Sequence, residues 1–109
     1  MPKGQIRELV KICYQIAKEK GWWDRRRNDA ELIALMHSEL SEALEALRQR
    51  RSRQELAEEL ADCCIRIFDY CGRKRIDLEE AIVKKIEGAL IVMATRDTRK
   101  VKFSFSSKK

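Results

Sequence analysis

Apolar residues recur with helical spacing in four successive segments of the chain. Neighbouring residues of a helix lie about 100° apart, so apolar positions three or four residues apart share one face. This pattern predicts helices over residues 5–20, 28–49, 52–71 and 77–87, the last with an extension towards residue 93. We therefore expect an all-α fold with a four-helix bundle-like protomer.

Capping residues indicate where these helices begin and end. Asn28, Ser52 and Asp77 each precede a glutamate three residues further on, which is a helix N-terminus signal. Glycine often ends a helix. The glycines near the ends of periodic segments are Gly21, Gly72 and Gly88.

The segment 28–49 carries two adjacent apolar stripes rather than one. The first stripe comprises Ile33, Met36, Leu40, Leu44 and Leu47, and the second comprises Leu32, Leu35, Ala43 and Ala46. So wide an apolar arc suggests burial against both the helix's own bundle and a partner subunit. Glu39 falls within the second stripe and Glu42 at its edge, whereas His37 lies on the polar side and is expected at the surface. A carboxylate directed into protein costs several kcal/mol unless it is protonated, paired or bound to a metal.

The charge of the chain is concentrated at its C-terminal end. Residues 96–109 contain six Lys or Arg and one acid, and so carry five of the six net positive charges. We interpret residues 1–93 as a helical domain and residues 94–109 as a basic, disordered tail. The tail and the arginine clusters favour nucleic-acid binding, but no motif that reads nucleic acid accompanies them, so we do not expect that partner.

The cysteines and the apolar runs indicate the compartment. Cys13, Cys63, Cys64 and Cys71 have no C-x-x-C spacing, which favours buried free thiols in a reducing environment. No signal-peptide pattern is present, and the longest apolar run, residues 89–94, is too short to cross a membrane. We expect a cytoplasmic protein without a membrane partner.

Two pairs of acids carry the candidate chemistry. Glu39 with Glu42, and Glu59 with Asp62, are each spaced by three residues on successive helices. A short connection makes those helices antiparallel neighbours, so the carboxylates can converge. Oxygen ligands without His or Cys suit Mg²⁺, or Mn²⁺ as a substitute, rather than Zn²⁺.

A plainer interpretation of the third segment is also open. Its acids and Arg66 form a polar arc beside the apolar stripe, as solvated charges do on any amphipathic helix. In that case Arg66 pairs with Asp62 or Asp69 along its own helix.

The paired motif resembles a known family. The two acid pairs, with sixteen intervening residues, match the E-x-x-E and E-x-x-D signature of the MazG-like all-α nucleoside triphosphate pyrophosphohydrolases. The stretches LMHSELSEALEALR, EELADCCIRIFDY and IDLEEAIVKKIE, together with KGWWD at residues 20–24, are similar to one subgroup over residues 5–87.

The resemblance implies an activity and a site. Such enzymes hydrolyse a nucleoside triphosphate to a monophosphate and pyrophosphate, which cleans the nucleotide pool. They act as homodimers or homotetramers, with Mg²⁺ held by residues matching Glu39, Glu42, Glu59 and Asp62. One of these four catalytic acids takes the proton of the attacking water instead, and Glu39, the most enclosed, is the best candidate. We expect Trp22 or Trp23 to stack on a base or to lie in the core or a dimer interface. Lys85 matches a phosphate-binding lysine.

The match ends after the fourth helix. Ala89 stands where relatives have an asparagine, and their Arg-Pro and His-Gly segment is missing. One hypothesis is a shifted reading frame, because codons for residues 98–100 can encode His-Gly-Lys one nucleotide later; translating the gene in all frames tests this. An alternative function is therefore a catalytically impaired helical assembly or regulatory module.

Overall fold

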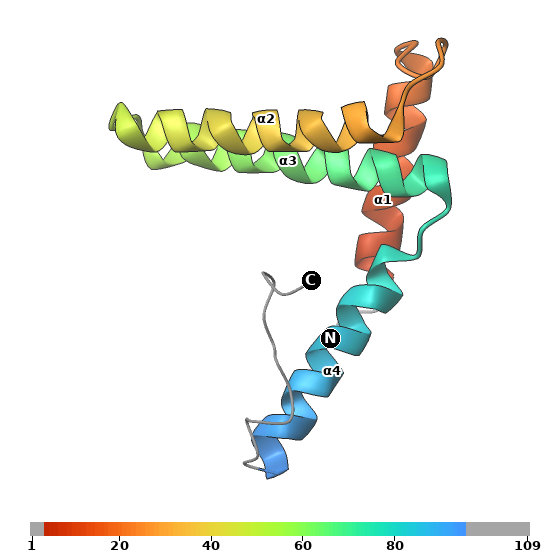
Figure 1. Ribbon diagram of the computed structural model, residues 1–109, viewed down its shortest axis with the longest axis vertical. Coiled ribbons are helices and arrows are strands. Elements are labelled where there is room, and N and C mark those ends of the chain that lie inside the picture. The colour runs from red at the N-terminus through yellow and green to blue at the C-terminus, as the bar shows by residue number, and fades with distance from the viewer. Residues whose placement is uncertain (1–3, 96–109) are drawn as a thin grey trace. The chain divides into compact units, whose positions relative to one another are not determined.

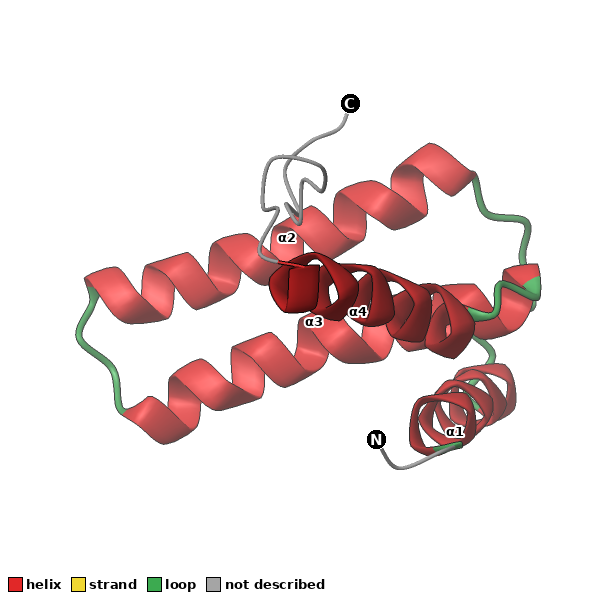
Figure 2. Cartoon of the chain, turned by 90° about the horizontal axis from the view of Figure 1, so that it is seen from below, coloured by secondary structure: helices red, strands yellow, loops and turns green. Residues whose placement is uncertain are grey.

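The chain folds into helices. The computed structural model describes residues 4–95, and residues 1–3 and 96–109 are not described. The helices are α1 (Gln5–Glu19), α2 (Asp29–Arg48), α3 (Arg53–Lys74) and α4 (Leu78–Thr95) (Figure 1). Residues 4–95 contain only helices and connecting loops (Figure 2), which confirms the all-α class. The predicted tail lies outside the described residues except for Ala94 and Thr95, which belong to α4.

The chain divides into two units, Met1–Ile76 and Asp77–Lys109. In the first unit α3 packs against both α1 and α2. Helices α2 and α3 lie side by side and run antiparallel, because only residues 49–52 connect them (Figure 1). The second unit contains α4. The four-helix bundle-like protomer stays a prediction.

The predicted helix starts are confirmed by their hydrogen bonds. Asn28 Oδ1 accepts from the backbone N–H groups of Ala30 and Glu31, at 2.7 and 3.2 Å. Ser52 and Glu55 form the reciprocal capping box. These caps depend on residues two or three apart in sequence, which is why the sequence alone locates them.

One of the two predicted glycine stops is wrong. Gly21 adopts a φ of 84° after α1, as a helix-ending glycine does. Helix α3 instead continues past Gly72 to Lys74. Helix α4 continues past Gly88 to Thr95, which includes the predicted extension towards residue 93. Gly72 has a packing role, because a Cβ there would lie 2.6 Å from Tyr14 Cβ. Its missing side chain lets α1 approach α3 closely.

The two apolar stripes of α2 have different environments. Residues of the second stripe face α3, and its buried members are Leu32, Ala43 and Ala46. Cys63 and Cys71 of α3 are also buried. Four members of the first stripe remain exposed in the single chain, with exposed fractions from 41% at Ile33 to 62% at Leu47; the other two are Leu40 and Leu44.

No helix within residues 4–95 combines the length and the apolar character that crossing a membrane requires.

Candidate metal centre

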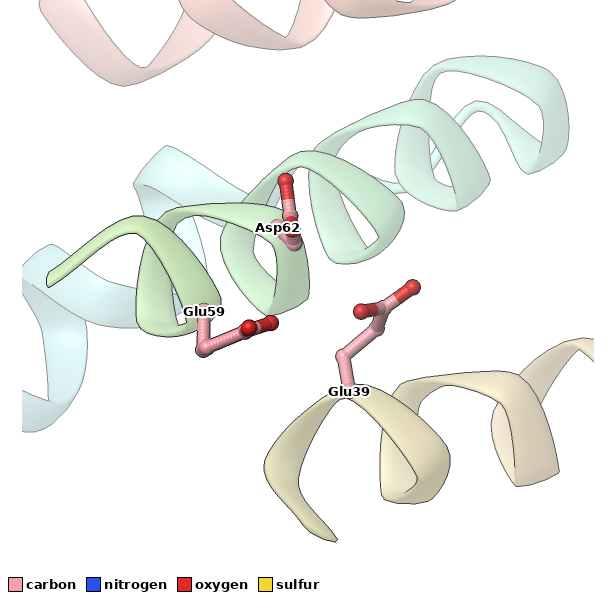
Figure 3. A group of neighbouring side chains, drawn as sticks. All are labelled: Glu39, Glu59 and Asp62. Carbon is pink, nitrogen blue, oxygen red and sulfur yellow. The ribbon is translucent and has the colours of Figure 1, made fainter. Parts of the chain in front are cut away.

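Three carboxylates from two helices converge between α2 and α3. An oxygen atom from each of Glu39, Glu59 and Asp62 lies within 4.8 Å of the other two. Figure 3 shows Glu39 reaching from α2 towards the two α3 side chains. The antiparallel pairing of the helices therefore brings together residues separated by about twenty positions in sequence. We call Glu39, Glu59 and Asp62 the carboxylate triad.

The triad fits a small divalent cation. Mg²⁺ holds oxygen ligands at about 2.1 Å, so two ligands on opposite sides of the ion lie about 4.2 Å apart. Oxygens that are already within 4.8 Å of one another need only small side-chain adjustments to reach that spacing. The donors are all carboxylates, which suits Mg²⁺ or Mn²⁺ rather than a softer metal.

Glu42, the fourth predicted ligand, lies beside the triad rather than within it. Its side chain is exposed on α2. Its charge still acts on the triad, because the Glu42 and Asp62 carboxylates contribute to a raised pKa at Glu59. The largest cause of that raised pKa is partial desolvation, and Arg51 opposes it. Glu42 as a metal ligand stays a prediction.

Two arginines balance the triad's negative charge. Arg66 Nε donates a hydrogen bond to Glu39 Oε2, which links α3 to α2 across 27 positions. Arg51 Nη1 lies 3.9 Å from Glu59 Oε2. Pairing of Arg66 along its own helix is thus wrong. The Glu39 side chain is only 17% exposed, so the sequence prediction that it points towards protein is confirmed.

An open pocket of about 490 Å³ lies next to the triad. Two triad members, Glu39 and Asp62, line it, together with Trp22, Arg27 and Arg66. Its wall also includes apolar residues of α1 and α3, such as Ile16 and Ile65, and the charged residues Lys20 and Asp69. The pocket therefore combines a carboxylate edge, two guanidinium groups and an indole.

Trp22 is held by an arginine that the sequence analysis did not single out. The Arg27 guanidinium lies 3.5 Å from the centroid of the Trp22 ring, and its Nε donates to the Trp22 carbonyl oxygen at 2.8 Å. The Arg66 guanidinium lies 5.2 Å from the same ring. Within the run RRR at residues 25–27, no local pattern distinguishes Arg27 from its neighbours.

Trp23 has a structural environment instead. Its Nε1 donates a 2.8 Å hydrogen bond to Asp69 Oδ1, and its ring packs edge to face against Tyr14. Asp69 is buried, with 8% exposure, so a solvated position on the polar arc is wrong for this residue. Burial raises the pKa of Asp69, against the lowering effects of the Trp23 hydrogen bond and nearby arginines. Of the two tryptophans, Trp22 is the better placed to contact a ligand at the triad.

The remaining predicted residues lie elsewhere. Lys85 is exposed on α4, in the second unit, and its phosphate-binding role stays a prediction. His37 is exposed, as expected. All cysteines are free, and Cys63 and Cys71 are buried, but the expectation of burial is wrong for Cys64, which faces solvent.

Comparisons with protein-family models, curated proteins and solved structures find no match to this chain.

Proposed function

We propose that this protein is a Mg²⁺-dependent nucleoside triphosphate pyrophosphohydrolase, which converts a nucleoside triphosphate and water to a nucleoside monophosphate and pyrophosphate. The convergence of Glu39, Glu59 and Asp62 at the edge of a pocket carries this proposal. The sequence resemblance to MazG-like enzymes also supports it, and the same acids carry that resemblance.

The chemistry needs what these side chains offer. Triphosphate oxygens are anionic and are repelled by carboxylates, and a bound Mg²⁺ would neutralise them and lower the pKa of a water molecule. Glu39, Glu59 and Asp62 would hold the cation in place. One carboxylate of the paired acids would remain off the cation and accept the proton of the attacking water. Trp22 lines the pocket and offers a ring for stacking on the base.

The proposed enzyme acts as a homodimer or homotetramer. The exposed row on α2 supports this, because Ile33, Leu40, Leu44 and Leu47 leave apolar surface uncovered in the single chain. The same row also fits the alternative function, a helical assembly or regulatory module without turnover.

Pyrophosphate release from a panel of canonical and modified deoxy- and ribonucleoside triphosphates tests the proposal. We expect release with Mg²⁺ and none with EDTA, and Glu39→Gln should lower the rate by at least about a hundredfold.

A matched pair of variants makes the test specific. Glu59→Gln removes a triad carboxylate, whereas Glu58→Gln removes an exposed carboxylate that bonds Gln54 on the same helix. The first should abolish turnover and the second should preserve it. If the folded protein binds Mg²⁺ but releases no pyrophosphate from any substrate, the assembly module becomes the better proposal.

A further inference from the structure

Arg66 occupies the position where the triad meets the pocket. It bonds Glu39 in an ion pair whose side chains are only 33% and 17% exposed, so water screens the pair weakly. Its guanidinium also lies near the Trp22 ring and lines the same pocket as Asp62. One side chain thus contacts a metal-ligand candidate and the space beside it.

We propose that Arg66 is an internal counter-ion that pairs with Glu39 in the metal-free protein, leaves Glu39 when a divalent cation binds, and then contacts the anionic phosphates of the ligand. The proposal rests on the proposed function for its metal site and ligand class. It adds that one residue opposes cation binding and promotes nucleotide binding.

Electrostatic repulsion explains why Arg66 should leave Glu39 when a cation binds. The Arg66 guanidinium bonds Glu39 Oε2. The carboxylate of Glu39 also lies close to those of Glu59 and Asp62. A divalent cation held by Glu39 would lie a few ångströms from this guanidinium, and like charges at that distance repel strongly in a partly buried site. Arg66 must therefore move before the triad can hold a cation well.

The surroundings of Arg66 explain why it should then contact the phosphates of the ligand. The Trp22 ring and the Arg27 guanidinium border the pocket into which Arg66 can turn. The Asp69 carboxylate lines the same pocket and interacts with both guanidinium groups, and a cation at the triad would leave Arg66 without Glu39 as its partner. Guanidinium groups bind phosphate oxygens through paired hydrogen bonds, so a polyphosphate would supply the displaced Arg66 with a new partner.

Arg51 offers a matched control. It also pairs with a triad carboxylate, Glu59, and its side chain is 35% exposed, close to the 33% of Arg66. It differs in that the pocket wall includes Arg66 and not Arg51. Replacing either arginine with Gln removes one positive charge near the triad, but only Arg66→Gln removes a group facing the pocket.

The test measures two affinities of the full-length protein by titration calorimetry. The first is the Mn²⁺ affinity without nucleotide, and the second is the affinity for an α,β-methylene nucleoside triphosphate at saturating Mg²⁺. Arg66→Gln should bind Mn²⁺ about tenfold more tightly and the analogue about tenfold more weakly. Arg51→Gln should tighten Mn²⁺ binding and leave analogue binding within about twofold. Arg66→Met, which keeps the apolar stem of the side chain, should repeat both shifts if the Gln variant does not fold.

Opposite shifts in one variant would distinguish this role from a structural one. If Arg66→Gln weakens both affinities, or changes neither, the counter-ion proposal is overturned, even in an active enzyme. If the wild-type protein shows no turnover but the opposite shifts occur, the proposed function fails and the counter-ion role stands. Absence of Mn²⁺ binding by the wild-type protein would overturn both.

Discussion

The Trp23 indole donates a hydrogen bond to the buried carboxylate of Asp69 at 2.8 Å, across 46 positions of the chain. This bond anchors the connection after α1 to the C-terminal half of α3. Trp22, the next residue, is thereby held at the pocket. The two tryptophans therefore have separate roles, one in holding the connection and one in lining the pocket.

Substitution should separate these roles. Trp23→Phe keeps a ring but leaves Asp69 without its indole donor, so we expect the free energy of unfolding to fall by about 1–3 kcal/mol. Trp22→Phe should cost less stability and instead weaken binding of the nucleotide analogue. Denaturant unfolding and calorimetry measure the two effects. Equal loss of stability in both variants would contradict the separate roles of Trp22 and Trp23.

The buried carboxylate of Asp69 should make stability depend on pH. Its pKa is raised in the folded protein, so the folded state holds the proton more tightly than the unfolded chain does. The contribution of Asp69 to stability therefore falls as the pH rises from the ordinary aspartate pKa through the raised one. Asp69→Asn keeps an oxygen acceptor for Trp23 and removes the ionisation.

Comparison of the variant with the wild-type protein isolates this group. The stability of Asp69→Asn relative to wild type should increase as the pH rises from the ordinary aspartate pKa, about 4, through the raised one. Denaturant unfolding across that range measures it, since the other acids contribute equally to both proteins. A difference that stays constant or decreases with pH would exclude the predicted ionisation.

The two glycines inside helices α3 and α4 predict opposite effects of one substitution. Gly72→Ala places a methyl group 2.6 Å from Tyr14 Cβ and 3.3 Å from the Val10 carbonyl oxygen, and backbone cannot easily move away. We expect the free energy of unfolding to fall by about 1–3 kcal/mol.

Gly88→Ala meets no atom within 4 Å and should increase the stability of α4 by up to about 1 kcal/mol. Circular dichroism during thermal unfolding compares them, and a stable Gly72→Ala would contradict the close approach of α1 and α3.

The exposed row on α2 predicts self-association. Leu40 and Leu47 are 53% and 62% exposed, and a charged residue at either position would place that charge inside the proposed subunit interface. Leu40→Glu and Leu47→Glu should therefore each raise the dissociation constant of the oligomer at least about tenfold. Sedimentation velocity measures this change. Ser41→Glu, at an exposed polar position of the same helix, is the control. A monomeric wild-type protein would refute the prediction.

The sequence by itself determined the helices and the acid pairs. Caps at Asn28 and Ser52 depend on atoms two or three residues apart, and apolar spacing identifies the face of each helix, so both can be recognised locally. The spacing of the paired acids also predicted that Glu39, Glu59 and Asp62 would meet, because antiparallel neighbours bring such pairs together.

Only the tertiary structure decided which contacts form between helices. Gly72 lies within α3 where α1 leaves no room for a side chain, and Asp69 is buried where the Trp23 connection lies against it. Arg66 bonds Glu39 rather than an acid on its own helix. Each outcome depends on a partner that is distant in sequence, and helical periodicity indicates which face is covered but not what covers it.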